Sequence, residues 1–213
     1  MKSILATLVL ATAATAASAA PINLLTNGSF ETSGPAAGSW DIRNSIAGWS
    51  VGNLGVELRN NVAGVAQDGN TFVELDTTGN SWISQSVATA YGATYHLSFW
   101  YAPREGTLKN TNGIDVLWNG AVIQSMAKDY GNAANPWIKY DFFLTAFAPV
   151  SALEFRATGL SDSLGGSLDN VSLLRENAVA ATAAVPEPAT LAMMALGMVA
   201  LTTARRRQQT ARA

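Results

Sequence analysis

The feature that most constrains the fold of this chain is an alternation of apolar and polar residues that runs from Ile22 to Leu174. Turn-forming residues interrupt it about every eight to twelve positions, and no stretch keeps a helical period for the length of an ordinary helix. Alternation places successive side chains on opposite faces of a strand, so that one face can be buried while the other meets water. The pattern predicts an all-β fold, an antiparallel β-sandwich.

Three segments indicate which face of each strand lies in the core. One side of each carries large apolar residues, which are Tyr95, Leu97, Phe99 and Tyr101, then Ile138, Tyr140, Phe142 and Leu144, then Leu153, Phe155 and Ala157. The other sides carry charged residues, whose burial without partners would be costly. Further strands are expected at 48–51, 56–59, 71–76, 82–87, 114–118 and 121–125. Asn119-Gly120 between the last two predicts a hairpin, because a type I′ turn needs positive φ at both central positions.

The composition excludes several classes of protein. The 213 residues contain no cysteine, which rules out disulfides, thiolate zinc sites and cysteine nucleophiles. Of 13 basic and 15 acidic residues, Lys2, four arginines near the C-terminus and Glu187 fall in the terminal segments. Eight basic and fourteen acidic residues remain, so the body has a net charge of about −6, which argues against a nucleic-acid or anionic-membrane partner.

The N-terminus has the pattern of a secretory signal peptide. Lys2 is followed by an apolar segment from Ile4 to Ala17, and Ala17-Ser18-Ala19 fits a cleavage site of small residues. Cleavage by signal peptidase is expected after Ala19, since cleavage one residue later would place Pro21 just beyond the scissile bond.

The C-terminus combines three features: Pro186-Glu187-Pro188, an apolar run over 189–203, and the cluster Arg205, Arg206 and Arg207. A helix of about fifteen residues is short for a hydrocarbon core of roughly 30 Å, and the arginines would hold its end in the cytoplasm. The three parts in this order resemble the PEP-CTERM sorting signal of Gram-negative bacteria, which an exosortase recognises and cuts. The alternative is an ordinary C-terminal anchor with an incidental proline turn, which would leave the protein in the membrane.

The chain therefore divides into five expected parts. These are a signal peptide at 1–19, a β-sandwich domain at 20–176, an Ala-rich linker at 177–185, the sorting signal with a short transmembrane helix at 186–208, and a tail at 209–213. No internal repeat indicates a solenoid or propeller.

The body resembles galactose-binding-like jelly rolls, a fold that many carbohydrate-binding modules share. Four segments carry the resemblance: 23–31 (Asn-Leu-Leu-Thr-Asn-Gly-Ser-Phe-Glu), Gly48-Trp49, 68–76 (Asp-Gly-Asn-Thr-Phe-Val-Glu-Leu-Asp) and 167–173 (Ser-Leu-Asp-Asn-Val-Ser-Leu). The fold hosts sugar binding, protein adhesion and scaffolding, so the resemblance implies an architecture more than a function.

The same resemblance implies a structural calcium ion that links the first and last strands through Glu31 and Asp169. Calcium takes six to eight oxygen ligands, so backbone carbonyls and the turn containing Asp68 and Asn70 would have to contribute. The alternative is that Glu31 ends a strand in solvent and Asp169 bonds a turn amide.

A ligand surface is expected on the face of one strand that carries His96 and Trp100, with Lys139 and Asp141, or Glu154 and Arg156, supplied by other strands. A sugar needs an aromatic plate and planar polar groups. The alternative is that Trp100 covers the sheet edge under a loop.

Catalysis is not expected. His96 is the sole histidine, so a Ser-His-Asp or metal-histidine site would depend on it alone. A glycan hydrolase needs only two carboxylates, which Glu57, Glu74, Asp76, Asp115 and Glu154 could supply, but nothing marks a pair.

The sequence thus predicts an exported, non-catalytic envelope or matrix protein that exosortase sorts and that mediates exopolysaccharide-associated adhesion. It contacts the inner membrane transiently, through its C-terminal helix. The alternatives are a specific carbohydrate-binding protein and, third, a glycan hydrolase.

Overall fold

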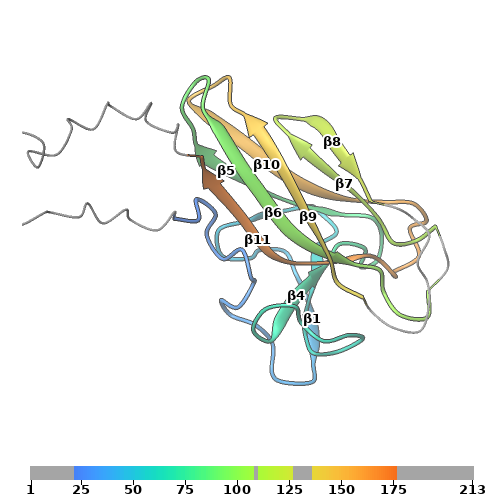
Figure 1. Ribbon diagram of the computed structural model, residues 1–213. Helices are drawn as coiled ribbons and strands as arrows, with labels where there is room; N and C mark the ends of the chain where they lie inside the picture. Colours follow the sequence, from blue (N-terminus) through green and yellow to red (C-terminus); the bar gives the residue numbers. More distant parts are fainter. Residues whose placement is uncertain (1–21, 108–109, 127–135, 177–213) are drawn as a thin grey trace, which may run out of the picture. The chain divides into compact units, whose positions relative to one another are not determined.

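The computed structural model describes residues 22–107, 110–126 and 136–176, which form an all-β unit (Figure 1). Eleven strands and no helix occur in these ranges. The strands are β1 Trp40–Arg43, β2 Ser50–Val51, β3 Val56–Asn60, β4 Thr71–Glu74, β5 Trp82–Ala88, β6 Thr94–Ala102, β7 Gly113–Trp118, β8 Ala121–Ser125, β9 Ile138–Thr145, β10 Val150–Thr158 and β11 Ser167–Arg175. The expected signal peptide, linker and sorting tail lie outside the described residues, and within those residues no helix is long and apolar enough to cross a membrane.

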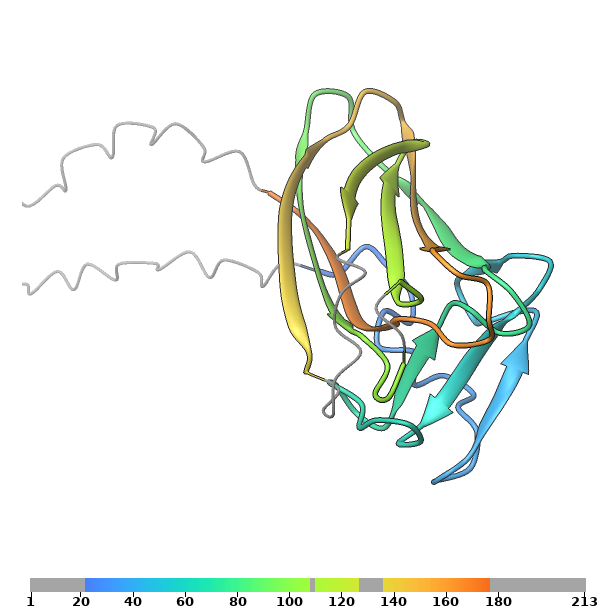
Figure 2. The ribbon, with the colours of Figure 1, turned by 90° about the vertical axis from the view of Figure 1, so that its right-hand side faces the viewer.

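The strands form two antiparallel sheets that pack face to face (Figures 1 and 2). One sheet has six strands in the order β1-β3-β4-β11-β6-β9, and the other has five in the order β2-β5-β10-β7-β8. Phe99 of β6 contacts Phe155 of β10 edge to face, with ring centroids 5.1 Å apart. Side chains from both sheets therefore interdigitate in one core, which confirms the β-sandwich.

The expected core faces are confirmed in β6 and β10 and only partly in β9. Tyr95, Leu97, Phe99 and Tyr101 are buried, as are Leu153, Phe155 and Ala157. In β9 Leu144 is buried, Tyr140 and Phe142 are partly buried against the core, and Ile138 is 37% exposed. The difference arises because β9 is the outermost strand of its sheet and has a neighbour on one side only.

The expected hairpin at Asn119-Gly120 is confirmed, while two expected strands are shorter in the structure, β2 and β4, and one strand was not expected. β7 and β8 pair antiparallel across Asn119 and Gly120, whose φ angles are 51° and 81°. The apolar–polar pattern does not predict β1, a four-residue strand at the other edge of the six-stranded sheet. Short edge strands with exposed residues show a weak alternation.

The segment before β1 closes the domain by pairing with β11. The amide N–H of Leu24 donates to the carbonyl of Leu173, and that of Val171 donates to the carbonyl of Gly28, both at 2.9 Å. The Asn23 side chain forms two hydrogen bonds to the backbone of β11. Its amide nitrogen donates to the carbonyl of Val171, and its amide oxygen accepts from the N–H of Leu173. The beginning and the end of the described chain consequently lie together at one end of the sandwich.

Candidate functional site

The outward side of β6 and β9 gathers four of the five residues expected in a ligand site. We define the β6–β9 outer face as His96, Ser98 and Trp100 of β6 with Lys139, Asp141 and Phe143 of β9. The register places His96 opposite Phe143, Ser98 opposite Asp141, and Trp100 opposite Lys139. These residues alternate with the core residues of the same strands, so the sandwich fold itself turns them outward.

Asp141 is the polar centre of this face. Its Oδ1 atom lies 2.9 Å from Nε2 of His96 and 3.1 Å from Nζ of Lys139. Desolvation raises the pKa of Asp141, but the hydrogen bonds and charges of Lys139 and His96 outweigh it and hold the pKa below its ordinary value. Exposed ion pairs of this kind add little to stability. The cluster therefore presents an ordered carboxylate, an ammonium group and an imidazole to solvent.

Phe143 is a residue of this face that the sequence analysis did not select. Its ring stacks on His96 with centroids 5.0 Å apart and planes at 20°, and 70% of the residue is exposed. The alternation of β9 already placed it on the same side as Lys139 and Asp141, so the signal was present. An exposed aromatic ring beside ordered polar groups is the combination that a sugar ring requires.

Trp100 lies on the expected face, whereas Arg156 does not. Trp100 is half-buried and lies in register between Asp169 of β11 and Lys139. Arg156 belongs to β10 of the five-stranded sheet, where its guanidinium contacts Glu154 at 2.5 Å. Sequence alternation gives the face of a strand but not the sheet to which the strand belongs, so Arg156 is not part of the β6–β9 outer face.

The four residues expected around a calcium ion do come together, at the loop between β3 and β4. Oε1 of Glu31 accepts the amides of Asn70 and Thr71 at 2.9 and 2.7 Å. Oδ2 of Asp169 accepts the amides of Gln67 and Asp68 at 2.8 and 3.0 Å. The two carboxylates thereby fasten the opening segment and the closing strand to the same loop.

Oε1 of Glu31 and both oxygens of Asp169 thus accept backbone N–H groups, whose partly positive hydrogens would repel a cation. Within the described ranges, no group of three or more His, Asp or Glu residues could hold a metal ion. Desolvation raises the pKa of Asp169 to about 7, against the amide hydrogen bonds that lower it. As arranged, these residues fit a loop clamp better than a calcium cage, and calcium binding stays a prediction.

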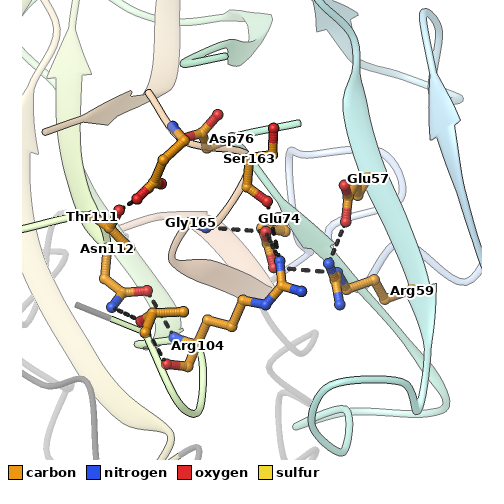
Figure 3. Close-up of polar contacts among 11 residues, drawn as sticks. Glu57, Arg59, Glu74, Asp76, Arg104, Thr111, Asn112, Ser163 and Gly165 are labelled. Atoms are coloured by element: carbon orange, nitrogen blue, oxygen red, sulfur yellow. Dashed lines mark hydrogen bonds and ion pairs between the residues drawn. The ribbon is translucent and has the colours of Figure 1, made fainter. Parts of the chain in front are cut away.

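A second set of charges is buried on the outward side of β3 and β4 (Figure 3). Glu57 and Glu74 lie directly opposite one another in the sheet, and Arg59 forms ion pairs with both carboxylates. Arg104, from the loop after β6, donates to Oε1 of Glu74 at 2.8 Å. Figure 3 shows Arg59 between the two glutamates and Arg104 reaching Glu74 separately. We call these four residues the buried charge network.

The two glutamates of the buried charge network are shielded from solvent. Glu74 is fully buried and Glu57 is 4% exposed. Desolvation raises the pKa of Glu74 to about 7, although attraction to Arg59 and Arg104 opposes the rise. Arg59 also lies under the half-exposed ring of Trp40, 5.8 Å from its centroid. Alternation predicted these faces, but only the sheet order brings the four charges into contact.

Comparison with known proteins gives relatives by sequence among the repeats-in-toxin proteins of Vibrio species and solved structures that share the fold. The chain is 36% identical over 163 residues to a multifunctional-autoprocessing repeats-in-toxin protein of Vibrio cholerae, and this covers 76% of the chain but 3% of the toxin. A Stig cyclase from Fischerella sp. TAU is 13% identical with a TM-score of 0.54, covering 74% of this chain and 98% of the cyclase. A family 35 carbohydrate binding module from Clostridium thermocellum is 21% identical with a TM-score of 0.42, covering 63% and 97% of the two chains.

These likenesses differ in what they establish. The cyclase shares the fold of the sandwich, and at such low identity the likeness extends no further. The toxin relationship concerns a small part of a far longer protein. Residues 184–208 match the family model of the PEP-CTERM protein-sorting motif, as the C-terminal sequence predicts, and this motif implies export. The chain is therefore an exported protein that carries a PEP-CTERM protein-sorting motif.

Proposed function

We propose that this chain is a non-catalytic protein of the cell envelope or extracellular matrix that adheres to polysaccharide through the β6–β9 outer face. Signal peptidase removes residues 1–19, and the short transmembrane helix within 186–208 holds the chain at the inner membrane until exosortase cuts the tail. The mature protein then acts at the cell surface or in the matrix. The jelly-roll, galactose-binding-like architecture proposed for the sandwich suits this role.

The observation that carries the proposal is the exposed ring of Phe143 beside the His96–Asp141–Lys139 cluster. The ring offers an apolar plate for the C–H face of a sugar, and the cluster offers donors and an acceptor for its hydroxyl groups. The alternative role of charges on an edge strand is to prevent pairing with another sheet. That role needs Lys139 and Asp141 but gives no reason for exposing Phe143.

The third candidate function, a glycan hydrolase, has weaker support than a specific carbohydrate-binding protein. A hydrolase needs two carboxyl groups that flank an accessible bond. Glu57 and Glu74 are neighbours across the sheet, but both are buried and bound by arginines. Their geometry favours a structural role, so we place the function in binding.

Phe143→Ala is expected to weaken binding to a recognised polysaccharide about tenfold, since it removes a stacking contact of about 1–1.5 kcal/mol. The ligand would first be found on an array of bacterial polysaccharides, and the affinity then measured by calorimetry. Tyr91→Ala is the matched control, because Tyr91 is an exposed aromatic outside this face. Unchanged affinity in both Phe143→Ala and Trp100→Ala would place the binding site elsewhere.

We also retain a structural calcium ion at Glu31, Asp169, Asp68 and Asn70 as a proposal, and it predicts a higher melting temperature in calcium than in chelator. An ion that binds only the folded state stabilises it by mass action. Glu31→Gln with Asp169→Asn should abolish the difference. Equal melting temperatures for the unaltered protein in calcium and in chelator would show that the carboxylates act as an amide clamp without an ion.

A further inference from the structure

An uncharged apolar tip stands at one end of the sandwich. It consists of Tyr91 in the connection from β5 to β6, Phe147 and Pro149 in the connection from β9 to β10, and Val150 at the start of β10. Tyr91, Phe147 and Val150 are 79%, 69% and 55% exposed. The rings of Tyr91 and Phe147 meet edge to face, with centroids 6.1 Å apart.

The two connections are fastened to each other by backbone hydrogen bonds (Figures 1 and 2). The amide of Thr89 donates to the carbonyl of Pro149 and that of Gly92 to the carbonyl of Ala146, both at 2.8 Å. The amide of Ala146 donates to the carbonyl of Ala93 at 3.0 Å. Because these backbone groups are paired, the apolar tip can enter a medium of low polarity at less cost than an unpaired loop.

The two connections that form the apolar tip carry no charged residue, although the domain is acidic. No Asp, Glu, Lys or Arg occurs in 81–95 or in 142–153, while the body as a whole has a net charge of about −6. Exposed apolar patches on a soluble domain mark contact surfaces. An anionic surface would repel most of the domain, but not the apolar tip.

The chain leaves the sandwich at the same end. Arg175, the last residue of β11, is in register with Tyr95, just after the connection that carries Tyr91. The roughly thirteen residues between Arg175 and Ala189, where the apolar run begins, span at most about 50 Å when fully extended. As long as the tail is anchored, this end of the domain stays within that distance of the bilayer. The apolar tip therefore has a high effective concentration at the membrane surface.

We propose that the apolar tip docks into the interfacial region of the lipid bilayer while the uncut tail anchors the chain. The inference rests on the proposed function, because the anchor supplies the proximity. Tyrosine and phenylalanine suit this boundary, where rings are buried and a hydroxyl group can reach water. Such a small apolar contact binds only weakly by itself, so cutting the tail releases the domain.

The test uses the full chain, which has no cysteine, with Phe147→Cys carrying an environment-sensitive NBD label. The protein is reconstituted into vesicles of phosphatidylethanolamine and phosphatidylglycerol. We expect blue-shifted emission and quenching by lipids that carry a spin label near the headgroup. Val65→Cys is the control, because Val65 is 71% exposed and lies away from the apolar tip. Its carbonyl accepts a hydrogen bond from the indole of Trp137. Trp137 directly precedes β9, at the end of that strand opposite to the one that pairs with Thr94.

The outcomes distinguish docking of the apolar tip from anchoring of the tail, on which docking depends. Alkaline carbonate extraction shows whether the chain is anchored in the same vesicles. If the chain resists extraction and the label at position 147 remains as aqueous as the one at position 65, docking is wrong while anchoring stands. If the chain is extracted, anchoring fails and the inference fails with it. A blue shift that increases with the ratio of protein to lipid would assign the apolar tip to a second copy of the chain instead.

Discussion

Replacing Arg59 by methionine is expected to lower the free energy of unfolding by about 3–5 kcal/mol, the range for removing one partner of a buried ion pair. Arg59 pairs with Glu57 and Glu74, which lie opposite each other and are buried. Methionine keeps the length of the apolar stem but removes the charge. Glu57 would then lose its ion-pair partner, and only Arg104 would still face Glu74. Urea unfolding followed by tryptophan fluorescence measures the loss.

The pH dependence of this loss has a definite sign. Desolvation raises the pKa of Glu74 to about 7 and Arg59 opposes that rise, so removing Arg59 raises the pKa further. A carboxyl group whose pKa is raised by folding stabilises the fold below its unfolded pKa, and the contribution disappears as pH rises through the folded pKa. The difference between the variant and the unaltered protein should therefore grow as pH rises through about 7, where Glu74 ionises in the unaltered protein but not yet in the variant.

Arg156→Met is the matched control for this experiment. Arg156 is also paired with a glutamate two positions away in its strand, but half of its side chain is exposed. Exposed pairs contribute about 0–1 kcal/mol, so this variant should change little. A similar loss in both variants would mean that the buried charge network is no more than a set of surface ion pairs.

Gly28→Ala is expected to destabilise the domain by about 3 kcal/mol, through overpacking and the loss of a backbone hydrogen bond. A Cβ atom on Gly28 would overlap the carbonyl oxygen of Val171, which is a backbone atom and cannot rotate away. The carbonyl of Gly28 also accepts from the amide of Val171. The substitution would push the opening segment off β11. Thermal unfolding monitored by circular dichroism measures the effect.

Gly38→Ala separates this close approach from the ordinary cost of replacing glycine. Gly38 has a φ of 72°, and a Cβ atom there would meet nothing within 4 Å. Only backbone strain remains, at about 1–2 kcal/mol. If Gly28→Ala costs no more than Gly38→Ala, the opening segment is free to move away from β11, and its pairing does not close the domain.

Much of the fold could be predicted because strands leave a local signal. The alternation in 95–101 and 153–158 predicted both the strands and their buried faces, and Asn119-Gly120 predicted a hairpin. The signal weakened at the edges of the six-stranded sheet. β1 is short and its residues are partly or fully exposed, and Ile138 of β9 is exposed to solvent rather than packed in the core. An edge strand has a neighbour on one side only, so its alternation no longer reports burial.

The candidate site was predictable only in part. His96, Lys139 and Asp141 shared a face in the sequence pattern, and the pairing of β6 with β9 joins them. Arg156 also lies on the polar, outward side of its strand, but that strand, β10, belongs to the other sheet. Glu31 and Asp169 were expected to share a site, and the structure brings both to one loop, where Asp169 accepts turn amides as the alternative interpretation had it.

The sequence by itself determined the strand periodicity and the PEP-CTERM motif at 184–208, because each depends on residues that are close together in the chain. Only the tertiary structure decided which residues from distant strands meet. It joined Glu57, Arg59, Glu74 and Arg104 into a buried network and placed Tyr91 beside Phe147 at the end where the chain leaves the domain. A period of two fixes the face on which a side chain lies, whereas its neighbours depend on the order of strands in the sheet, which non-local pairing decides.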